Sequence, residues 1–376
     1  MKTINFAVIG CGLMGREFGS AVLRWRHLTA DIATPQIIGV CNRSPGPREW
    51  FDAFPLKYSV SDYRELLDKP DIDAVYCAVP HDAHEQIYVD VINAGKHLMA
   101  EKPFGIDKKA NANILAAIKN NPGVFVRCSS EFPFFPACRN IINWFKEDRF
   151  GKILEIRAAF NHSSDMDLSK PINWKRIVEK NGEYGCIGDL GIHTQHIPLR
   201  MGLTPLNAYA VLTKAVSARP DGKGGTAACD TWDNASIICE TRGVHGETFP
   251  MFFETRRMRP GATNQWTLEV YGMDASAKFS TDDSNAFYYT HSWGKEQAWC
   301  RLGVGYKPQT PAITGPIFEF GFSDAILQMW AAFIAELEGK PVEFGCFTPE
   351  ETRISHLINT AALESHKTKR AAEINI

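Results

Sequence analysis

Near the start of the chain lies a run of residues whose types and spacing suit phosphate binding: Gly10-Cys11-Gly12-Leu13-Met14-Gly15. It follows the apolar run Asn5 to Ile9 and opens a stretch with helical character. In such a unit the first glycine permits a tight turn, the second lets the backbone approach a pyrophosphate, and the third allows close packing of helix on strand. The positive N-terminus of the helix faces the phosphates. We therefore expect these six residues to bind a dinucleotide. The alternative is a glycine-rich turn in an unrelated α/β protein.

The end of the second predicted strand bears on the choice between NAD and NADP. An Asp or Glu at this point binds the ribose 2′-hydroxyl of NAD. This chain instead has Asn42-Arg43-Ser44 after the strand Ile37 to Cys41. Because a cation and a hydroxyl suit a 2′-phosphate, we expect NADP to be favoured over NAD. An Arg43 that only stacks on the adenine would be compatible with NAD.

A lysine at a strand end is the first candidate for proton transfer. Glu101-Lys102-Pro103 follows the apolar run His97 to Ala100, and ligands of doubly wound sheets bind at the carboxyl ends of strands. Lys102 is therefore directed at the cofactor cleft, where partial burial and a cationic nicotinamide would lower its pKa towards neutrality. Such a lysine can take or give a proton. The alternative is a lysine exposed to solvent.

An aspartate and a histidine share one face of a later helix. Asp189 and His193 are four residues apart in a stretch predicted to be helical from near Asp189, so their side chains lie one above the other. Together they can hydrogen-bond the hydroxyls of one substrate. The alternative for His193 is a core histidine whose hydrogen bonds are satisfied within the fold.

The elements that position these residues change in kind near residue 128. Before it, short apolar runs alternate with helical stretches, which predicts βαβ units on a doubly wound parallel sheet. After it, strand-like runs follow one another with little helix between, which favours a mostly antiparallel sheet with helices on one face. We therefore predict an α/β protein with a dinucleotide-binding Rossmann domain at 1–128 and an α+β substrate-binding and oligomerisation domain with an open sheet at 129–376.

Further elements follow from the same patterns. Two terminal helices are predicted at Ser323 to Glu338 and Thr348 to Lys367. The glycine-rich stretch Ser217 to Thr231 is expected to be a mobile loop between strands. Arg24 to Gln36 is expected to be a surface insertion. Strands are predicted at Asn5–Ile9, Ile37–Cys41, Ala74–Ala78, His97–Ala100, Val124–Cys128, Lys152–Phe160, Leu206–Val216, Ala235–Thr241, Thr248–Thr255, Trp266–Tyr271, Ala277–Ser280 and Ala286–Tyr289.

The order of motifs along the chain resembles the Gfo/Idh/MocA oxidoreductase family, named for glucose-fructose oxidoreductase and inositol dehydrogenase. After GxGxxG come a Pro-x-x-x-His at Pro80 and His84, a Gly-Lys-His from Gly95 and the Glu-Lys-Pro of Lys102. The second half has Asn173-Trp174-Lys175 and a G-x-x-x-D-x-G-x-H run from Gly185 to His193. The similarity extends over essentially the whole chain.

The resemblance implies roles for individual residues. Lys102, Asp189 and His193 would be the catalytic residues, with Lys102 and His193 flanking the substrate carbon that faces nicotinamide C4. Lys102 would act as general acid and base, His193 as hydrogen-bond partner or alternate proton carrier, and Asp189 would orient the substrate. The substrate would also contact Trp174 and Lys175. Beyond the glycine turn and Asn42 to Ser44, the cofactor-binding residues would be Ala78, Val79, Pro80, His81, His84, Glu101 and Lys102.

Other residues are weaker candidates for substrate contact. His196 stands where the family often has an Asp, and Glu131 where it commonly has an Arg; a structural role is the alternative for both. His162, Asp165 and Asp167 lie in a polar loop ahead of Trp174. A sugar ring can also stack on aromatic residues such as Trp174, Trp232 and Trp293, with core packing as the alternative.

The function that these residues indicate is an NAD(P)-dependent oxidoreductase. It would interconvert a secondary alcohol of a sugar, sugar derivative or polyol with the ketone. One alternative is a redox-assisted glycoside hydrolase with tightly held NAD, and another is a non-catalytic dinucleotide-binding regulator. By resemblance, a homodimer or homotetramer is expected.

Composition argues against several other classes. Lys plus Arg is 41 against Asp plus Glu 43, a formal charge of −2, so the chain has no basic excess for nucleic acid or an anionic membrane. No apolar window reaches the length of a membrane helix. The ten cysteines contain no CxxC pair, which argues against a zinc ribbon or a disulfide framework and favours reduced thiols in the cytoplasm. No metal is expected, a site built from His162, His193 and His196 being the alternative.

Overall fold

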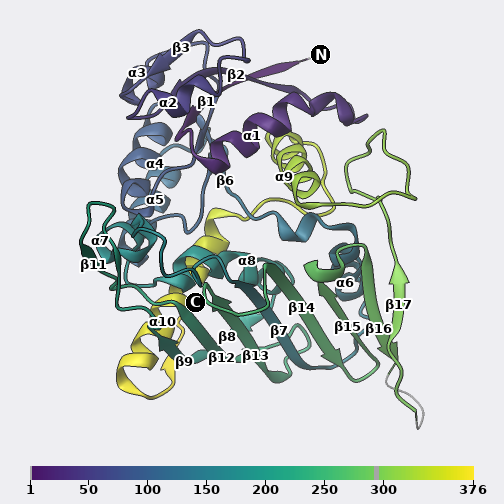
Figure 1. The fold of residues 1–376 in the computed structure, drawn as a ribbon. Coiled ribbons are helices and arrows are strands. Elements are labelled where there is room, and N and C mark those ends of the chain that lie inside the picture. The colour runs from purple at the N-terminus through teal and green to yellow at the C-terminus, as the bar shows by residue number, and fades with distance from the viewer. Residues whose placement is uncertain (1, 292–295) are drawn as a thin grey trace. The chain divides into compact units, whose positions relative to one another are not determined.

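The protein's computed structural model describes residues 2–291 and 296–376, and the chain forms two compact units (Figure 1). The first unit comprises Met1–Gly105, Lys109–Phe134 and Tyr306–Pro349. The second comprises Ile106–Lys108, Phe135–Gly305 and Glu350–Ile376. Trp293, a predicted stacking residue, lies outside the described residues.

The first unit is built on a six-stranded parallel sheet in the order β3-β2-β1-β4-β5-β6. Its strands are almost entirely apolar and buried because helices cover both faces. This confirms the predicted Rossmann sheet; the short edge strand β3 was missed because three residues carry too little pattern. The strands are β1 (Thr3–Ile9), β2 (Thr34–Cys41), β3 (Tyr58–Val60), β4 (Ala74–Cys77), β5 (His97–Ala100) and β6 (Val126–Cys128).

A helix from late in the chain packs on this sheet. The Trp330 ring on α9 stacks on Phe18 of α1, with ring centroids 3.8 Å apart, and lies edge-on to Tyr76 of β4 at 4.9 Å. The helical segments of the first unit are α1 (Leu13–Leu23), η1 (Trp25–His27), α2 (Gly46–Glu49), α3 (Arg64–Leu67), η2 (His81–Ala83), α4 (His84–Asn93), α5 (Lys108–Asn120), η3 (Phe132–Phe134) and α9 (Phe322–Leu337).

The compact units are therefore not separated at a single point in the chain. The predicted boundary between 128 and 129 makes each domain one continuous stretch of the chain. In the structure, residues 306–349 cluster with the Rossmann residues instead, because α9 buries its apolar side chains there. Whether that boundary separates independently folding domains stays a prediction.

The prediction of a surface insertion at Arg24 to Gln36 is wrong. Trp25 and Ala33 in this segment are buried, and its last residues belong to β2. The segment packs against the 306–349 region: Leu28 forms a β-bridge with Ala312, and Arg24 pairs with Asp324 at the start of α9.

The second unit is built on a ten-stranded, mostly antiparallel sheet, as predicted. Its order is β17-β16-β15-β14-β7-β13-β12-β9-β18, with β8 beside β12; β7 pairs parallel with β13 and antiparallel with β14. The strands are β7 (Ile153–His162), β8 (Thr204–Pro205), β9 (Asn207–Thr213), β12 (Asn234–Arg242), β13 (Thr248–Arg256), β14 (Asn264–Gly272), β15 (Ala275–Ser280), β16 (Ala286–His291), β17 (Cys300–Gly303) and β18 (Ala372–Glu373).

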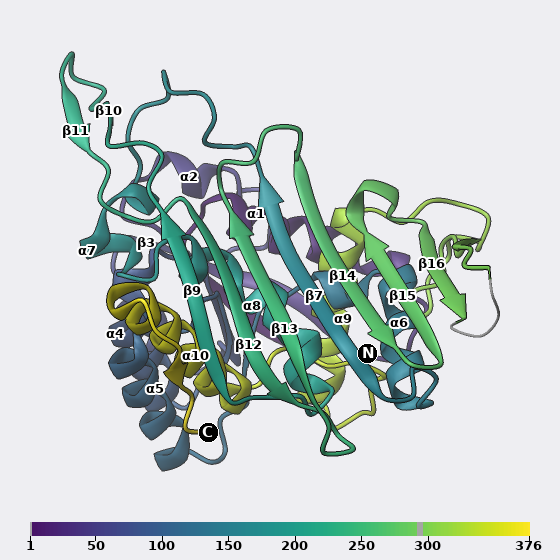
Figure 2. The same ribbon diagram turned by 90° about the horizontal axis from the view of Figure 1, so that it is seen from below.

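Helices of the second unit lie along one face of this sheet, as Figure 2 shows. Side chains alternate along β9, so that Ala208, Ala210 and Leu212 are buried while Tyr209 and Val211 are exposed. The helical segments are α6 (Pro136–Lys146), η4 (Trp174–Arg176), α7 (Val178–Asn181), α8 (Cys186–Arg200), η5 (Thr281–Asp283) and α10 (Pro349–Thr368).

The predicted loop at Ser217 to Thr231 contains a β-hairpin instead, in which β10 (Ala218–Pro220) pairs with β11 (Thr226–Ala228). The Asp221 carboxylate closes its turn by accepting hydrogen bonds from the backbone N–H groups of Lys223 and Gly225, at 2.7 and 2.9 Å. The buried Arg219 side chain donates to the backbone carbonyls of Asp165, Asp167 and Lys170. Turn chemistry rather than strand propensity therefore orders this segment.

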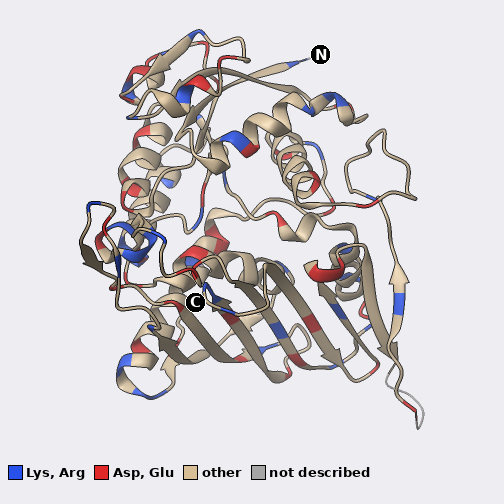
Figure 3. Ribbon diagram, in the orientation of Figure 1, with Lys and Arg blue, Asp and Glu red and all other residues tan. Residues whose placement is uncertain are grey.

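Charges of both signs are interspersed within each unit, as Figure 3 shows, in agreement with the formal charge of −2. Among the described residues, no helix combines the length and apolar character needed to cross a membrane.

Candidate functional site

The glycine turn after β1 has the form needed to hold a pyrophosphate. Gly10 has φ +99°, and a Cβ there would lie 2.2 Å from the carbonyl oxygen of Ala78. A Cβ on Gly15 would lie 2.2 Å from the carbonyl oxygen of Gly10. At Gly12, the N-cap of α1, a Cβ would meet nothing within 4 Å, so open space lies directly at the helix N-terminus. The turn therefore fits a dinucleotide phosphate.

The residues after β2 divide into a structural and an exposed part. Asn42 accepts a hydrogen bond from the backbone N–H of Cys11 at 3.3 Å and donates one to the carbonyl of Ser44 at 3.0 Å, so it ties the two turns together. The Cys11 thiol is buried against the carbonyl of Cys41, and burial raises its pKa to about 12. Arg43 and Ser44 are exposed, as are Gly12 and Leu13 within the glycine turn, while Met14 is half-buried.

Strand register brings the glycine turn and Lys102 to one edge of the sheet. Ile9 of β1 pairs with Cys77 of β4, and Cys77 pairs with Ala100 of β5. The next residues along these strands are therefore neighbours at the carboxyl edge: Gly10 with Ala78, Val79 and Pro80 on one side, and Glu101 with Lys102 on the other.

The backbone beside Lys102 is held by a buried carboxylate. Glu101 accepts hydrogen bonds from the hydroxyls of Tyr76 and Ser129, at 2.8 and 2.7 Å, and its carbonyl accepts one from the Tyr88 hydroxyl at 2.9 Å. Lys102 itself is half-buried, and its peptide bond to the following proline is cis. Glu101 therefore fixes the start of the segment that carries Lys102, and its carboxylate is engaged inside the protein.

Two predicted cofactor-binding histidines are buried. The His84 ring lies 3.1 Å from the carbonyl oxygen of Val79 through Nε2 and 3.4 Å from the backbone nitrogen of Gly105 through Nδ1, and it stacks on Tyr88. His81 is also buried, with its ring centroid 5.4 Å from that of His84. The His84 ring therefore shapes the turn after β4. Direct contact of either histidine with the cofactor stays a prediction.

In the second unit, Asp189 and His193 lie one turn apart on α8, as predicted, and both are buried. The helix starts at Cys186, three residues earlier than expected, because Gly185 caps it with φ +58°. A Cβ on Gly185 would lie 2.6 Å from the backbone nitrogen of Trp232. Asp189 in the first turn is stabilised by the positive end of the helix.

The His193 segment of the helix is held by two aromatic residues on the sheet. The indole N–H of Trp266 on β14 donates to the His193 carbonyl at 2.9 Å, and the Phe160 ring on β7 lies edge-on to the imidazole at 5.4 Å. His193 therefore has a fixed position over the sheet.

Asp189 is the centre of a group of cations. Its Oδ2 accepts hydrogen bonds from Nζ of Lys175 at 2.9 Å and from Nε and Nη2 of Arg257 at 3.3 and 3.2 Å. The predicted substrate-binding Lys175 also lies over the Trp174 ring, with Nζ 5.8 Å from the centroid. Arg257 is not recognisable from the sequence, because nothing in the pattern separates it from the neighbouring Arg256.

The weaker candidates have different surroundings. Burial lowers the pKa of His162 to about 4, and charge interactions with Asp189 and Lys175 act on the same ring. Asp165 forms an ion pair with the buried Arg176 at 2.6 Å, whereas Asp167 is exposed.

His196 and Glu131, the two residues that depart from the family pattern, are both buried. Burial lowers the pKa of His196 well below its ordinary value, and the neighbouring Arg200 acts in the same direction. Burial raises the pKa of Glu131 to about 7. No group of three or more His, Cys, Asp and Glu side chains suited to a metal occurs in the part of the chain that the structure describes.

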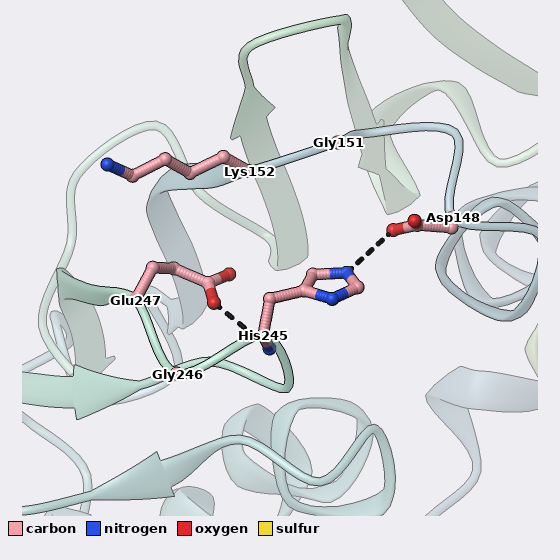
Figure 4. Close-up of a pocket in the computed structure, with 6 residues that line it drawn as sticks. All are labelled: Asp148, Gly151, Lys152, His245, Gly246 and Glu247. Atoms are coloured by element: carbon pink, nitrogen blue, oxygen red, sulfur yellow. Dashed lines mark hydrogen bonds and ion pairs between the residues drawn. The ribbon is translucent and has the colours of Figure 1, made fainter.

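A shallow pocket of about 480 Å³ lies away from these residues, at the turn between β12 and β13 (Figure 4). The exposed His245 ring lies 3.0 Å from the Asp148 carboxylate, which raises the pKa of the histidine. The backbone N–H of His245 donates to Glu247. The pocket contains none of the predicted site residues.

Family models match both the N-terminal part of the chain and the part that follows it. A family model described as "Oxidoreductase family, NAD-binding Rossmann fold" matches residues 4–128, and the model of the GFO/IDH/MocA C-terminal domain matches residues 138–278. Levoglucosan dehydrogenase of Pseudarthrobacter phenanthrenivorans is 25% identical over 301 residues, 74% of each chain. The scyllo-inositol 2-dehydrogenase (NADP(+)) IolU of Bacillus subtilis is 26% identical over 223 residues, which are 59% of this chain and 65% of that one.

Solved structures show the same fold over the full chain. A structure of levoglucosan dehydrogenase in complex with NADH and L-sorbose has a TM-score of 0.89 at 22% identity, with 100% of both chains covered. An oxidoreductase domain protein from Kribbella flavida has a TM-score of 0.90 at 21% identity, also with 100% of both chains covered. With its glycine turn, its Glu-Lys-Pro strand end and the two matched domains, the chain belongs to the Gfo/Idh/MocA oxidoreductase family.

Proposed function

We propose that this protein transfers a hydride between a nicotinamide dinucleotide and a secondary alcohol or ketone of a sugar, sugar derivative or polyol. The observation that supports this most directly is the register of β1, β4 and β5, which puts the phosphate-binding glycine turn and Lys102 at one edge of the sheet. Two relatives named as dehydrogenases of levoglucosan and scyllo-inositol support the substrate class.

Lys102, Asp189 and His193 act on one substrate in this proposal. The cofactor, when bound, takes up or gives the hydride. The neutral Nζ of Lys102 accepts the hydroxyl proton during oxidation, and the ammonium form returns it during reduction. Asp189 orients the substrate by accepting hydrogen bonds, and His193 is a hydrogen-bond partner or alternate proton carrier. Trp174 and Lys175 contact the rest of the substrate.

The test is oxidation of a panel of anhydrosugars, sugars and inositols, followed by the absorbance of the reduced nicotinamide. The Lys102→Met variant is expected to lose about 10²- to 10⁴-fold in kcat at saturating cofactor, the usual range for a general acid-base group. The exposed Lys109→Met is the matched control on the same unit. A Lys102→Met variant with parental kcat would contradict the catalytic assignment.

We further propose that NADP is favoured over NAD. Arg43 and Ser44 are exposed beside the glycine turn, where an acidic residue would be needed to bind the ribose hydroxyls of NAD. Support also comes from the relative that is named as NADP-dependent. Titration of the cofactor-free protein with NADPH and NADH compares the two affinities directly.

The same assays separate the alternative functions. A redox-assisted hydrolase would release sugar products without net formation of reduced cofactor, and a regulator would bind the dinucleotide without turnover. The relatives quoted above are named as dehydrogenases, so neither alternative has support from them.

Two general properties complete the proposal. We propose a homodimer or homotetramer that associates through the sheet face bearing the exposed Tyr209, Val211 and Ile238, which light scattering after size exclusion tests. We also propose a cytoplasmic location, supported by ten cysteines that are all free thiols, which localisation of a tagged full-length chain tests.

A further inference from the structure

A buried arginine in the second unit joins three segments around Asp189. Arg257 directly follows β13 and has no exposed surface. Besides Asp189, its guanidinium donates to the carbonyl of Lys175 at 3.0 Å, to the side-chain oxygen of Asn181 at 3.2 Å and to the carbonyl of Gly185 at 3.4 Å. One side chain therefore links η4, the end of α7 and the N-cap of α8. Only the planar fork of an arginine offers donors in these directions at once.

The geometry around Asp189 makes Arg257 the constant partner of this carboxylate. Asp189 has no exposed surface, and a carboxylate removed from water is costly unless it is paired and hydrogen-bonded. Lys175 also pairs with Oδ2, and its side chain is 38% exposed and ends in an amine. An arginine keeps its charge at every working pH, whereas a lysine beside a ligand can move or lose its proton.

Other titratable groups face Asp189 from the elements packed around it. His162 on β7 and Cys186 on α8 both interact electrostatically with the carboxylate, and His193 lies one turn further along the same helix. The neutral imidazole of His162 and the thiol of Cys186 offer no positive charge. Lys175 and Arg257 each place a positive charge in direct contact with Asp189.

We propose that Arg257 is a positioning residue of the reaction, which holds Asp189 ionised and in one orientation so that it accepts hydrogen bonds from the substrate. The same guanidinium fixes the backbone of Lys175, and through it the direction of a second substrate contact. This assignment rests on the proposed function, because it assumes that Asp189 and Lys175 contact the substrate.

The experiment compares Arg257→Gln, Arg257→Lys and the parent in the dehydrogenase assay across a range of pH. In Arg257→Gln, the kcat/KM for reduction of the keto sugar is expected to fall about 10-fold or more. The acidic limb of its pH profile in this direction, where Lys102 works in its protonated form, is expected to move up by about one unit, because loss of a cation favours the protonated Asp189 carboxyl. Arg257→Lys restores the position of the acidic limb but keeps a raised KM, because an ammonium cannot reach all four partners. The affinity for NADH and NADPH stays at the parental value in both variants.

Arg176→Gln is the matched control. Arg176 is equally buried and forms ion pairs with Asp165 and Asp233, but none with Asp189. Its loss is expected to lower the thermal unfolding temperature while leaving the acidic limb in place. A shift of the limb in Arg176→Gln equal to that in Arg257→Gln would show a general effect of buried charge and overturn the proposal.

The remaining outcomes are separable. A parent that oxidises a sugar, together with an Arg257→Gln variant that keeps the parental KM and acidic limb, overturns the role of Arg257 alone. A parent with no activity on the panel contradicts the proposed function, and this assignment falls with it. If Arg257→Gln does not fold, Arg257→Lys decides: a parental KM in the folded Lys variant contradicts the proposal.

Discussion

Replacing the buried Glu131 by glutamine is expected to stabilise the protein increasingly as pH rises. Glu131 follows β6 and is 5% exposed. Burial is the main cause that raises its pKa from 4.5 to about 7; the nearby Glu101 raises it further and Lys102 opposes it. Since the folded-state pKa lies above the unfolded one, the unfolded state ionises first, and the folded state loses relative stability between about pH 4.5 and 7.

The size of the effect follows from that interval. A separation of about 2.5 pH units corresponds to about 3 kcal/mol, since each unit is worth about 1.4 kcal/mol. Glutamine has the shape of the protonated acid and does not ionise, so Glu131→Gln removes the penalty. The expected gain is below about 1 kcal/mol at about pH 5 and close to about 3 kcal/mol at about pH 8.

Thermal unfolding followed by calorimetry measures the gain. At about pH 8 the unfolding temperature of Glu131→Gln is expected to exceed the parent's by about 6 °C or more, since about 1 kcal/mol is worth about 2 to 4 °C in a unit of this size. The exposed Glu179→Gln is the control and should follow the parent at every pH. A difference between Glu131→Gln and the parent that does not change with pH, or a less stable variant at high pH, would refute the reasoning.

Three further variants test other parts of the structure. Gly10→Ala should weaken NADH and NADPH binding in calorimetric titration, because φ +99° alone costs a non-glycine residue about 1 to 2 kcal/mol and the new Cβ would also meet the Ala78 carbonyl. Trp266→Phe should lower stability by about 1 to 3 kcal/mol in denaturant unfolding, since the buried His193 carbonyl loses its indole donor. Arg43→Ala should weaken NADPH binding about 10-fold or more with little change for NADH, as expected for a lost charge-assisted hydrogen bond; equal losses for both cofactors would contradict a contact with the 2′-phosphate.

Local pattern was sufficient for five of the six strands in the sheet of the first unit and for its glycine turn, but not for the short strand β3. The glycines at 10, 12 and 15 and the apolar strands predict a parallel sheet because each carries its own steric or burial requirement. The packing of α9 on that sheet was not predictable in this way. Trp330 is an ordinary buried aromatic in its helix, and only the folded chain shows that its partners are Phe18 and Tyr76.

In the candidate site, too, relations between residues close in the sequence were predictable and contacts between distant residues were not. Asp189 and His193 were placed together because a helix fixes the relation of residues four apart. The contact of Asp189 with Arg257 joins residues 68 positions apart. In the sequence, Arg256 and Arg257 are equivalent; in the fold, alternation at the end of β13 leaves Arg256 partly exposed beside Glu254 and buries Arg257. The two arginines differ in their burial, which cannot be read from a single sequence.

The interleaving of the two units has a consequence for biosynthesis. The chain leaves the first unit after Phe134, returns to it at Tyr306 and ends in the second unit. On the ribosome, the parallel sheet therefore emerges long before α9, and Phe6, Phe18 and Tyr76 lack the Trp330 ring that packs on all three in the finished protein. Transiently exposed apolar surface of this kind is a risk for aggregation and a substrate for chaperones. The unit that begins to emerge first is thus completed only when most of the chain has been translated.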